Sequence, residues 1–275
     1  MKITIFTSNQ SRHVALINRL ATISDKTFAV IECNTVFPGR VEDFYKKSKL
    51  MSRYFELVQL AEKRCFGDLS FTASSVSSLI LKSGDLNLLT PETLGEALDS
   101  DIYIVFGASY IKGWLVDYLI ARRAINIHMG LSPYYRGSSC NFWALYDNKP
   151  EYVGSTIHLL SKGLDSGPIL YHAVPQLNEA TPFEFTMNSV IAAQISLVDR
   201  IANGKLFHTE PLVQNLVDQI RYSRNSEFTD DVVASYFARN ISNRNIQERL
   251  SSAVKPTLRN PYFLNTSENN NHTSG

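Results

Sequence analysis

The segment MKITIFTSNQSRHVALINRLATISDKTFAVIECN, residues 1–34, contains two runs of β-forming apolar residues separated by a run with helical spacing. Residues 1–8 predict a buried strand, and residues 9–24 predict a helix for which Asn9 or Ser11 is the expected N-cap. The second apolar run, FAVIECN, predicts another strand. Because a strand–helix–strand unit is typical of parallel sheets covered by helices, this opening indicates an α/β fold.

Three later apolar segments continue the pattern. DIYIVFG (residues 101–107), AINIH (124–128) and VGSTIHLL (153–160) predict strands, and GWLVDYLIARR (113–123) predicts a helix between the first two. Together with the opening unit they predict a Rossmann-like fold, in which a mostly parallel open sheet carries helices on both faces.

The clearest helix lies in TPFEFTMNSVIAAQISLVDRIANGK. Thr181 is the expected N-cap, Pro182 suits the first turn, and Glu184 completes a capping box. Asn203 and Gly204 are expected to end the helix.

The segment before the third predicted strand is harder to interpret. Residues 41–66 predict an amphipathic helix that packs on the sheet, with a partner surface as the alternative. The Ser-rich residues 71–89 fit either a helix or a loop. Thr90, followed by Pro91 and Glu92, predicts a helix start.

The composition indicates an ordinary globular protein. A chain of 275 residues suffices for one large domain, or for a large and a small one. Its 27 Lys and Arg against 26 Asp and Glu give 27 − 26 = +1, so no charge excess favours nucleic acid or an anionic membrane. No segment approaches the roughly 20 apolar residues of a membrane span, and MKITIFTSNQ is too short for a signal peptide's apolar region. We therefore expect a cytoplasmic protein.

The cysteines do not form a recognisable metal or disulfide pattern. Cys33, Cys65 and Cys140 are far apart and show no CxxC or Cys/His spacing. We expect three reduced thiols and no metal site.

The pattern of apolar and polar residues changes after about Glu210, where short segments interrupted by polar residues begin. Residues 1–210 are expected to form the main domain, and residues 211–262 a small helical extension with two short helices. Residues 263–275 contain few groups to bury and are expected to form a disordered tail.

The turn after the first predicted strand, TSNQSRH, lacks the GxGxxG spacing of a dinucleotide site. Nicotinamide or flavin binding is therefore disfavoured. Ser8, Asn9 and Ser11 could hold a phosphate at the helix N-terminus, or could simply cap the helix.

Asn126 and His128 lie two residues apart at the end of a predicted strand, so their side chains share one face. The carboxyl ends of parallel strands are where open α/β sheets bind ligands. Alone, the pair fits a hydrogen-bonded core pair or half of an active site. Asp165, between Gly163 and Gly167, adds a carboxylate that could make an Asx-turn or sit beside His128 and raise its pKa.

Together the three side chains supply what acyl transfer to an amine requires. An amide such as that of Asn126 can donate a hydrogen bond to a developing oxyanion, and a His128–Asp165 pair can manage protons. The acceptor amine can attack directly, so no serine or cysteine nucleophile is needed. Cys140 as a nucleophile is disfavoured because no second base is evident.

These residues resemble the folate-dependent formyltransferases. That family has an Asn-x-His motif, a stretch with Leu and Pro, a Tyr/Arg-Gly pair and, further on, an Asp-x-Gly. Here the motif reads NIHMGLSPYYRG, and LDSGPIL places Asp165 165 − 128 = 37 residues after His128. The resemblance covers roughly residues 1–204 and is strong over 102–171. Met129 stands where the family often has Pro, and residues 41–89 match nothing in the pattern.

The resemblance implies a catalytic domain over residues 1–210, with Asn126 polarising the formyl oxygen and stabilising the tetrahedral intermediate. It implies that His128 assists proton transfer and that Asp165 orients or protonates it. The implied donor is 10-formyltetrahydrofolate, used as co-substrate without a metal. Its pterin would contact residues on two loops: Phe106, Gly107, Ser109, Tyr110 and Ile111 on the first, and Leu160, Gly163 and Leu164 on the second.

The resemblance leaves several acceptors open. A methionyl-tRNA enzyme carries a larger C-terminal β-barrel with a basic face, whereas only 275 − 210 = 65 residues follow Glu210 here, without a basic excess. A glycinamide ribonucleotide enzyme would have a Gly/Ser-rich phosphate loop in place of TSNQSRH. We therefore expect a small amine, most simply a nucleotide-linked amino sugar. Three alternative functions remain open: a methionyl-tRNA formyltransferase-like enzyme, a formyltetrahydrofolate hydrolase and a non-catalytic binding module. Whether the protein forms a homodimer is also open.

Overall fold

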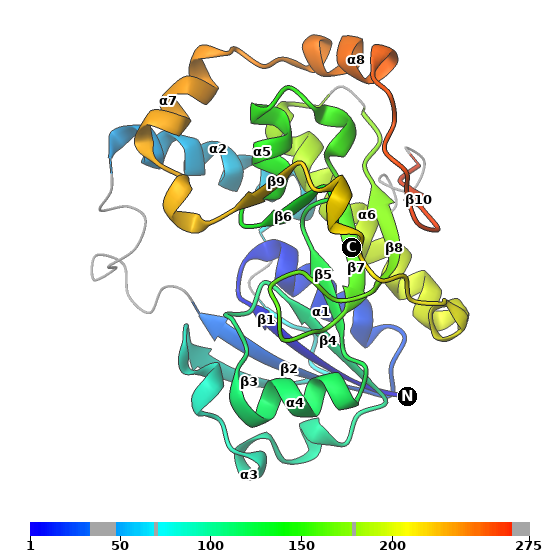
Figure 1. Ribbon diagram of the computed structural model, residues 1–275. Helices are drawn as coiled ribbons and strands as arrows, with labels where there is room; N and C mark the ends of the chain where they lie inside the picture. Colours follow the sequence, from blue (N-terminus) through cyan, green and yellow to red (C-terminus); the bar gives the residue numbers. More distant parts are fainter. Residues whose placement is uncertain (34–47, 69–70, 178–179, 266–275) are drawn as a thin grey trace.

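The structure, a computed structural model, describes residues 1–33, 48–68, 71–177 and 180–265. Its centre is an eight-stranded sheet with the order β10-β8-β7-β5-β4-β1-β2-β3 (Figure 1). The strands are β1 Lys2–Ser8, β2 Lys26–Cys33, β3 Val76–Lys82, β4 Ile102–Phe106, β5 Ile125–His128, β7 Ser155–Leu159, β8 Ile169–Val174 and β10 Tyr262–Phe263.

The sheet is mostly parallel, as the sequence predicts. Strands β3, β2, β1, β4 and β5 run in one direction. Strand β7 lies antiparallel between β5 and β8, and β10 adds a parallel strand beside β8. The chain proceeds outward from β1 to β3 and then returns to place β4 on the other side of β1. Such a reversal of strand order is where open α/β sheets form ligand crevices.

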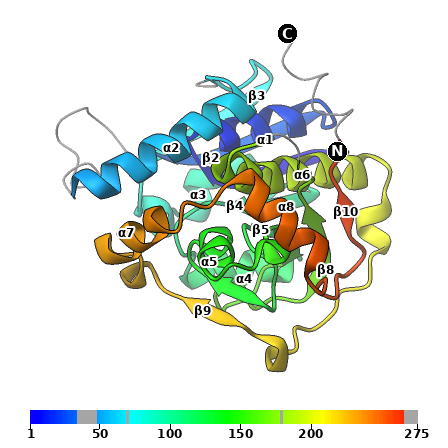
Figure 2. The same ribbon diagram turned by 90° about the horizontal axis from the view of Figure 1, so that it is seen from above.

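Helices cover both faces of the sheet, which confirms the predicted Rossmann-like arrangement. Figures 1 and 2 show α4 on the opposite side of the sheet from α1. Helices α1, α2 and α6 bury Ile5 and Ile104 on one face, whereas α3 and α4 bury Val105 on the other. The helices are α1 Ser11–Ala21, α2 Lys49–Phe66, α3 Pro91–Leu94, α4 Gly113–Ala121, α5 Cys140–Tyr146, α6 Pro182–Ala202, α7 Asp230–Ala238 and α8 Asn243–Ser252.

Two of the three predicted N-caps, Thr90 and Thr181, are confirmed. The capping box of Thr181 and Glu184 starts α6, and Asn203 is its C-cap. Thr90 caps α3 through the backbone N–H of Thr93. The first helix differs, because its N-cap is Gln10 without a side-chain capping bond; the expected cap at Asn9 or Ser11 is wrong, and Ser11 is already helical.

The segment before β4 contains an edge strand that the sequence leaves between a helix and a loop. Residues 76–82 form β3, which pairs in parallel with β2 at the end of the sheet. An edge strand has only one neighbouring strand, so its side chains need not all be apolar. The half-exposed sequence SSLILK is therefore compatible with a strand at this position. The predicted helix over residues 41–66 is α2 from Lys49 onward, and residues 41–47 lie outside the described residues.

The C-terminal region packs over α2 and α5. Strand β9 (Arg221–Ser223) pairs with β6 (Tyr135–Gly137), and the two predicted short helices are α7 and α8 (Figure 1). An aromatic cluster that includes Tyr54 of α2, Phe142 of α5 and Tyr236 of α7 joins these elements.

The chain then returns to the main sheet as β10. Leu264 is only 2% exposed and belongs to the main core. The expected disordered tail beginning at residue 263 is therefore wrong for residues 263–265, because pairing with β8 and burial of Leu264 hold them. Residues 266–275 lie outside the described residues. No helix in the described part of the chain is both long and apolar enough to cross a membrane.

Candidate active site

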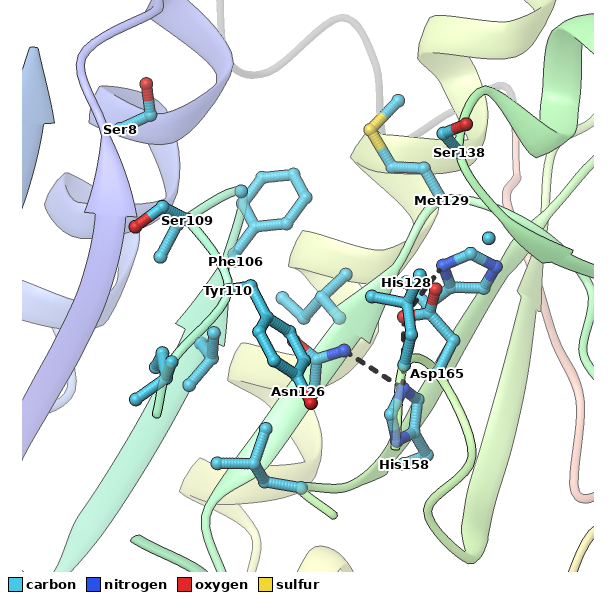
Figure 3. Close-up of a pocket in the computed structure, with 18 of the residues that line it drawn as sticks. Ser8, Phe106, Ser109, Tyr110, Asn126, His128, Met129, Ser138, His158 and Asp165 are labelled. Carbon is cyan, nitrogen blue, oxygen red and sulfur yellow. Dashed lines mark hydrogen bonds and ion pairs between the residues drawn. The ribbon is translucent and has the colours of Figure 1, made fainter. Parts of the chain in front are cut away.

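A large cavity lies at the carboxyl ends of β1, β4 and β5, where the strand order reverses. It has a volume of about 900 Å³ and is lined from the β1–α1 turn, the β4–α4 loop, β5 and the loop after β7. Figure 3 shows Phe106, Ser109 and Tyr110 toward one side of it and His128 and Asp165 toward the other, with Asn126 between them beside Tyr110. All three predicted catalytic side chains therefore line one cavity.

The side chain of Asn126 is held by a histidine that the sequence analysis did not identify. Its Nδ2 lies 3.0 Å from Nε2 of His158. His158 Nδ1 lies 2.8 Å from the carbonyl oxygen of Leu159. A carbonyl only accepts hydrogen bonds, so Nδ1 carries the proton and Nε2 accepts from the Asn126 amide. Burial lowers the pKa of His158 to about 4, which keeps this tautomer neutral.

The pairing of β5 with β7 brings these two residues together. Asn126 stands directly opposite His158 in the antiparallel register. The segment VGSTIHLL contains the histidine, but its partner depends on strand order and register. With one amide N–H used by His158, Asn126 keeps a second N–H for a ligand oxygen.

His128 and Asp165 form a buried ion pair. His128 Nδ1 lies 3.2 Å from Asp165 Oδ1, and the two side chains are 7% and 10% exposed. Burial lowers the pKa of His128, but the charge of Asp165 and the contact with Cys140 outweigh it, so this pKa is raised well above its usual value. Burial raises the pKa of Asp165, but the His128 charge outweighs it and lowers this pKa overall. At neutral pH the pair is an imidazolium and a carboxylate.

The turn that carries Asp165 is fixed by two side chains from elsewhere. Arg136 donates from Nη2 to the Leu164 carbonyl at 3.1 Å and from Nε to the Asp165 carbonyl at 3.3 Å. Gln214 donates from Nε2 to the carbonyls of Asp165 and Gly167 at 2.9 and 2.8 Å. These bonds hold Asp165 in a left-handed conformation with φ of 47°. Arg136 lies within the Tyr/Arg-Gly motif, whereas no sequence signal points to Gln214.

The residues predicted to contact a pterin line the same cavity. They are Phe106, Gly107, Ser109, Tyr110, Ile111, Leu160, Gly163 and Leu164. The Tyr110 hydroxyl donates to the carbonyl of Lys162, which links the two predicted loops. The His13 ring lies 4.7 Å from the Phe106 ring and also lines the cavity. The β1–α1 turn therefore contributes a wall that the sequence analysis considered only as a phosphate site or helix cap.

A smaller cavity of about 290 Å³ adjoins the first at His128. The two share four lining residues, namely Arg12, His128, Met129 and Gly137. Five aromatic rings line the smaller cavity: Tyr54, Phe55, Phe142, Phe183 and Phe228. The Arg12 guanidinium is paired with Glu62 at 2.7 Å, so an ion pair stands where the cavities meet.

Gly130 and Cys140 complete the surroundings of His128. A Cβ atom at Gly130 would lie 2.7 Å from His128 Nε2 and 2.5 Å from Cys140 Cβ, so only glycine fits between them. The three cysteines are free. Within the described ranges, no group of three or more His, Cys, Asp or Glu side chains is arranged to hold a metal ion.

Comparisons with known proteins relate the chain to one family. Residues 94–200 match the family model described as formyl transferase. A methionyl-tRNA formyltransferase from Synechococcus sp. (strain JA-3-3Ab) is 30% identical over 128 residues, which cover 46% of this chain and 39% of that protein. The chain thus spans less than half the length of this curated relative.

Two solved structures share the fold. A sugar N-formyltransferase from Shewanella sp. aligns with a TM-score of 0.51 at 16% identity, over 97% of this chain and 94% of that one. An N-formyltransferase from Helicobacter canadensis, in complex with folinic acid and dTDP-3-aminofucose, aligns with a TM-score of 0.50 at 13% identity, over 86% and 79% of the two chains. At these identities the likeness concerns the fold alone.

Proposed function

We propose that this chain transfers a formyl group from 10-formyltetrahydrofolate to the primary amine of a small substrate. The proposed substrate is a nucleotide-linked amino sugar. Residues 94–200 match the formyl transferase family, which supports this reaction. The convergence of Asn126, His128 and Asp165 on one cavity carries this proposal. The cavity of about 900 Å³ lies within the range of small-molecule sites, roughly 300–1,000 Å³.

The reaction needs an oxyanion donor and a proton carrier beside the formyl carbon. The acceptor nitrogen forms a bond to that carbon, and the carbonyl oxygen becomes an oxyanion. The oxyanion accepts a hydrogen bond from the free N–H of Asn126. The bond from the carbon to N10 then breaks. The amine must lose one proton and N10 must gain one. The charged His128 is placed to give its proton to N10 and then to take one from the amine, while Asp165 stabilises the imidazolium.

The smaller cavity suits the group that carries the amine. Its aromatic lining removes water from the amine, and the charges of Arg12 and His128 at its mouth are each balanced by a paired carboxylate. The loss of water disfavours an ammonium ion. A bound amine is therefore held in the neutral form, which is the nucleophilic one. A cavity of about 290 Å³ admits one compact group such as a sugar ring.

The C-terminal region favours an amino sugar over a tRNA. The 65 residues after Glu210 contain seven Lys and Arg and six Asp and Glu, giving 7 − 6 = +1. Binding a polyanion requires clustered cations, which this region does not supply. The Helicobacter canadensis protein, whose fold this chain shares, was solved with a nucleotide-linked amino sugar and a folate, which supports the same acceptor class.

One assay tests donor and acceptor together. Purified protein should release tetrahydrofolate from 10-formyltetrahydrofolate only when an acceptor amine is present, and mass spectrometry should find the formylated amine. Nucleotide-linked amino sugars, Met-tRNA and glycinamide ribonucleotide serve as parallel acceptors. His128→Ala and Asp165→Ala should abolish transfer. Release without any amine would indicate a hydrolase, formylation of Met-tRNA alone would replace the acceptor class, and absence of folate binding would overturn the proposal.

A further inference from the structure

We propose that Glu32, outside the catalytic cavity, is a positioning residue that sets the affinity for the folate co-substrate by fixing the loop between β4 and α4. This inference rests on the proposed function, since it assigns folate to that loop. The loop, residues 107–112, has no regular structure of its own and contributes much of one cavity wall.

Glu32, the residue before the last in β2, has a buried carboxylate that joins two separate loops. The residue is 2% exposed. Its Oε2 accepts from the backbone N–H of Ser109 at 2.6 Å, and its Oε1 accepts from the Ser109 hydroxyl at 2.9 Å. Oε1 also accepts from the backbone N–H of Gly84 at 2.8 Å, in the turn after β3.

These three bonds are the only compensation that the described residues provide for the buried charge. Glu32 forms no ion pair among them, although a carboxylate removed from water requires strong partners. Hydrogen bonds to an ionised carboxylate are roughly twice as strong as neutral ones. The contact with Glu32 therefore ties the Ser109 backbone to the sheet, and breaking its hydrogen bonds would be energetically unfavourable.

The contact acts on the cavity through the neighbouring residue. Tyr110 follows Ser109, and its hydroxyl bonds the Lys162 carbonyl in the second proposed folate loop. Asn87 holds the far end of the same loop, because its Nδ2 donates to the Tyr110 carbonyl at 2.9 Å and its Oδ1 accepts from Lys112 N at 2.7 Å. The middle and the far end of the loop are thus anchored to Glu32 and Asn87, which do not line the cavity.

Anchoring of this kind improves binding by lowering the entropy lost when a ligand orders its site. It does not alter the groups that stabilise the transition state. The smaller cavity, which we assign to the acceptor, has no lining residue from residues 107–112. A loosened loop should therefore weaken folate binding alone.

Glu32→Gln tests this directly, because it keeps the size of the side chain but turns one acceptor oxygen into a donor that faces an N–H or O–H group. We expect the Kd and KM for 10-formyltetrahydrofolate to rise about tenfold. The kcat at saturating folate and the acceptor KM should stay within about twofold of wild type. Glu151→Gln, another buried carboxylate at 9% exposure, is the control and should leave the folate KM unchanged.

Ser109→Ala supplies the second arm, since it removes only the hydroxyl donor and remains informative if Glu32→Gln does not fold. It should raise the folate KM by a smaller factor, and the double variant should be no worse than Glu32→Gln alone, because both act through one contact. Loss of kcat with unchanged folate KM, or loss of thermal stability alone, would overturn the inference. If wild type itself binds no folate, the proposed function fails instead.

Discussion

Asn126 and His158 face each other across the antiparallel pair of β5 and β7, with 3.0 Å between Asn126 Nδ2 and His158 Nε2. This contact decides which edge of the Asn126 amide faces the cavity. The orientation of the proposed oxyanion donor is therefore set by a histidine that burial keeps neutral.

Substitutions at these two positions should be strongly non-additive. Asn126→Ala should lower kcat/KM about 10²–10³-fold, the usual cost of losing one oxyanion donor. His158→Leu should cost less, because the amide remains but is free to rotate. The double variant should match Asn126→Ala in steady-state kinetics, since His158 acts through Asn126.

His158→Gln is the matched control for that cycle, because its amide oxygen can still accept from Asn126. It should recover part of the activity lost in His158→Leu. Additive losses in the double variant would mean that His158 contributes independently of Asn126.

The His128–Asp165 pair should give the fold a recognisable dependence on pH. The folded-state pKa of His128 is raised above the usual value of 6.5, so the stabilisation from His128 is complete below that pH and is lost as pH rises through the raised value. The folded-state pKa of Asp165 is lowered below 3.8, so its contribution is present above that value and lost in stronger acid. The pair should stabilise the fold most between these limits.

Urea unfolding of wild type and Asp165→Asn across this range measures the effect. The difference in free energy of unfolding should be largest between the ordinary pKa values of Asp and His, about 4 and 6.5, and should shrink as pH rises through the raised pKa of His128. A difference that stays flat, or that grows as pH rises, would contradict the assigned direction of the His128 pKa.

Much of the fold was accessible from local sequence signals, for identifiable reasons. The apolar runs of β1, β2 and β4 and the capping box of α6 are strong because each is written within a few adjacent residues. The strand β3 is not distinguished, because the adjacent exposed serines Ser77 and Ser78 interrupt its apolar run. The strand β10 was missed because two residues carry no periodicity, and only the neighbouring β8 makes them a strand.

The candidate site also contains residues that the sequence predicts and residues that it does not. Recognisable sequence motifs contain Asn126, His128 and Asp165, so these residues can be predicted from the sequence. His158, Gln214 and Glu32 could not, because each acts through a partner that only strand register or loop packing brings near. The aromatic lining of the smaller cavity comes from α2, α5, the start of α6 and the residue after a short 3-10 turn, which are distant in sequence.

Two adjacent residues at the end of the described chain test the importance of β10. Leu264 is 2% exposed in the main core, whereas Phe263 is 58% exposed. Leu264→Ala should cost about 2–5 kcal/mol in the free energy of unfolding. Phe263→Ala should cost much less, because its ring is mostly in water already. Equal losses measured by urea unfolding would show that β10 is not docked as described.

Two phenylalanines of the C-terminal region test whether this region forms part of the acceptor site. Phe228 and Phe237 are both half-buried in the aromatic cluster, with ring centroids 5.2 and 6.4 Å from that of Tyr54, but only Phe228 lines the smaller cavity. Alanine at either position should therefore lower stability by comparable amounts. Phe228→Ala should in addition raise the acceptor KM about tenfold, since one wall contact in an apolar site is worth roughly 1–3 kcal/mol.

The folate KM separates the two cavities in the same experiment. Phe228 does not line the larger cavity, so this constant should not change in either variant. Steady-state kinetics with each substrate varied in turn gives both constants. If Phe237→Ala raised the acceptor KM as much as Phe228→Ala, the effect would come from loosening of the whole aromatic cluster, and the smaller cavity would lose its assignment to the acceptor.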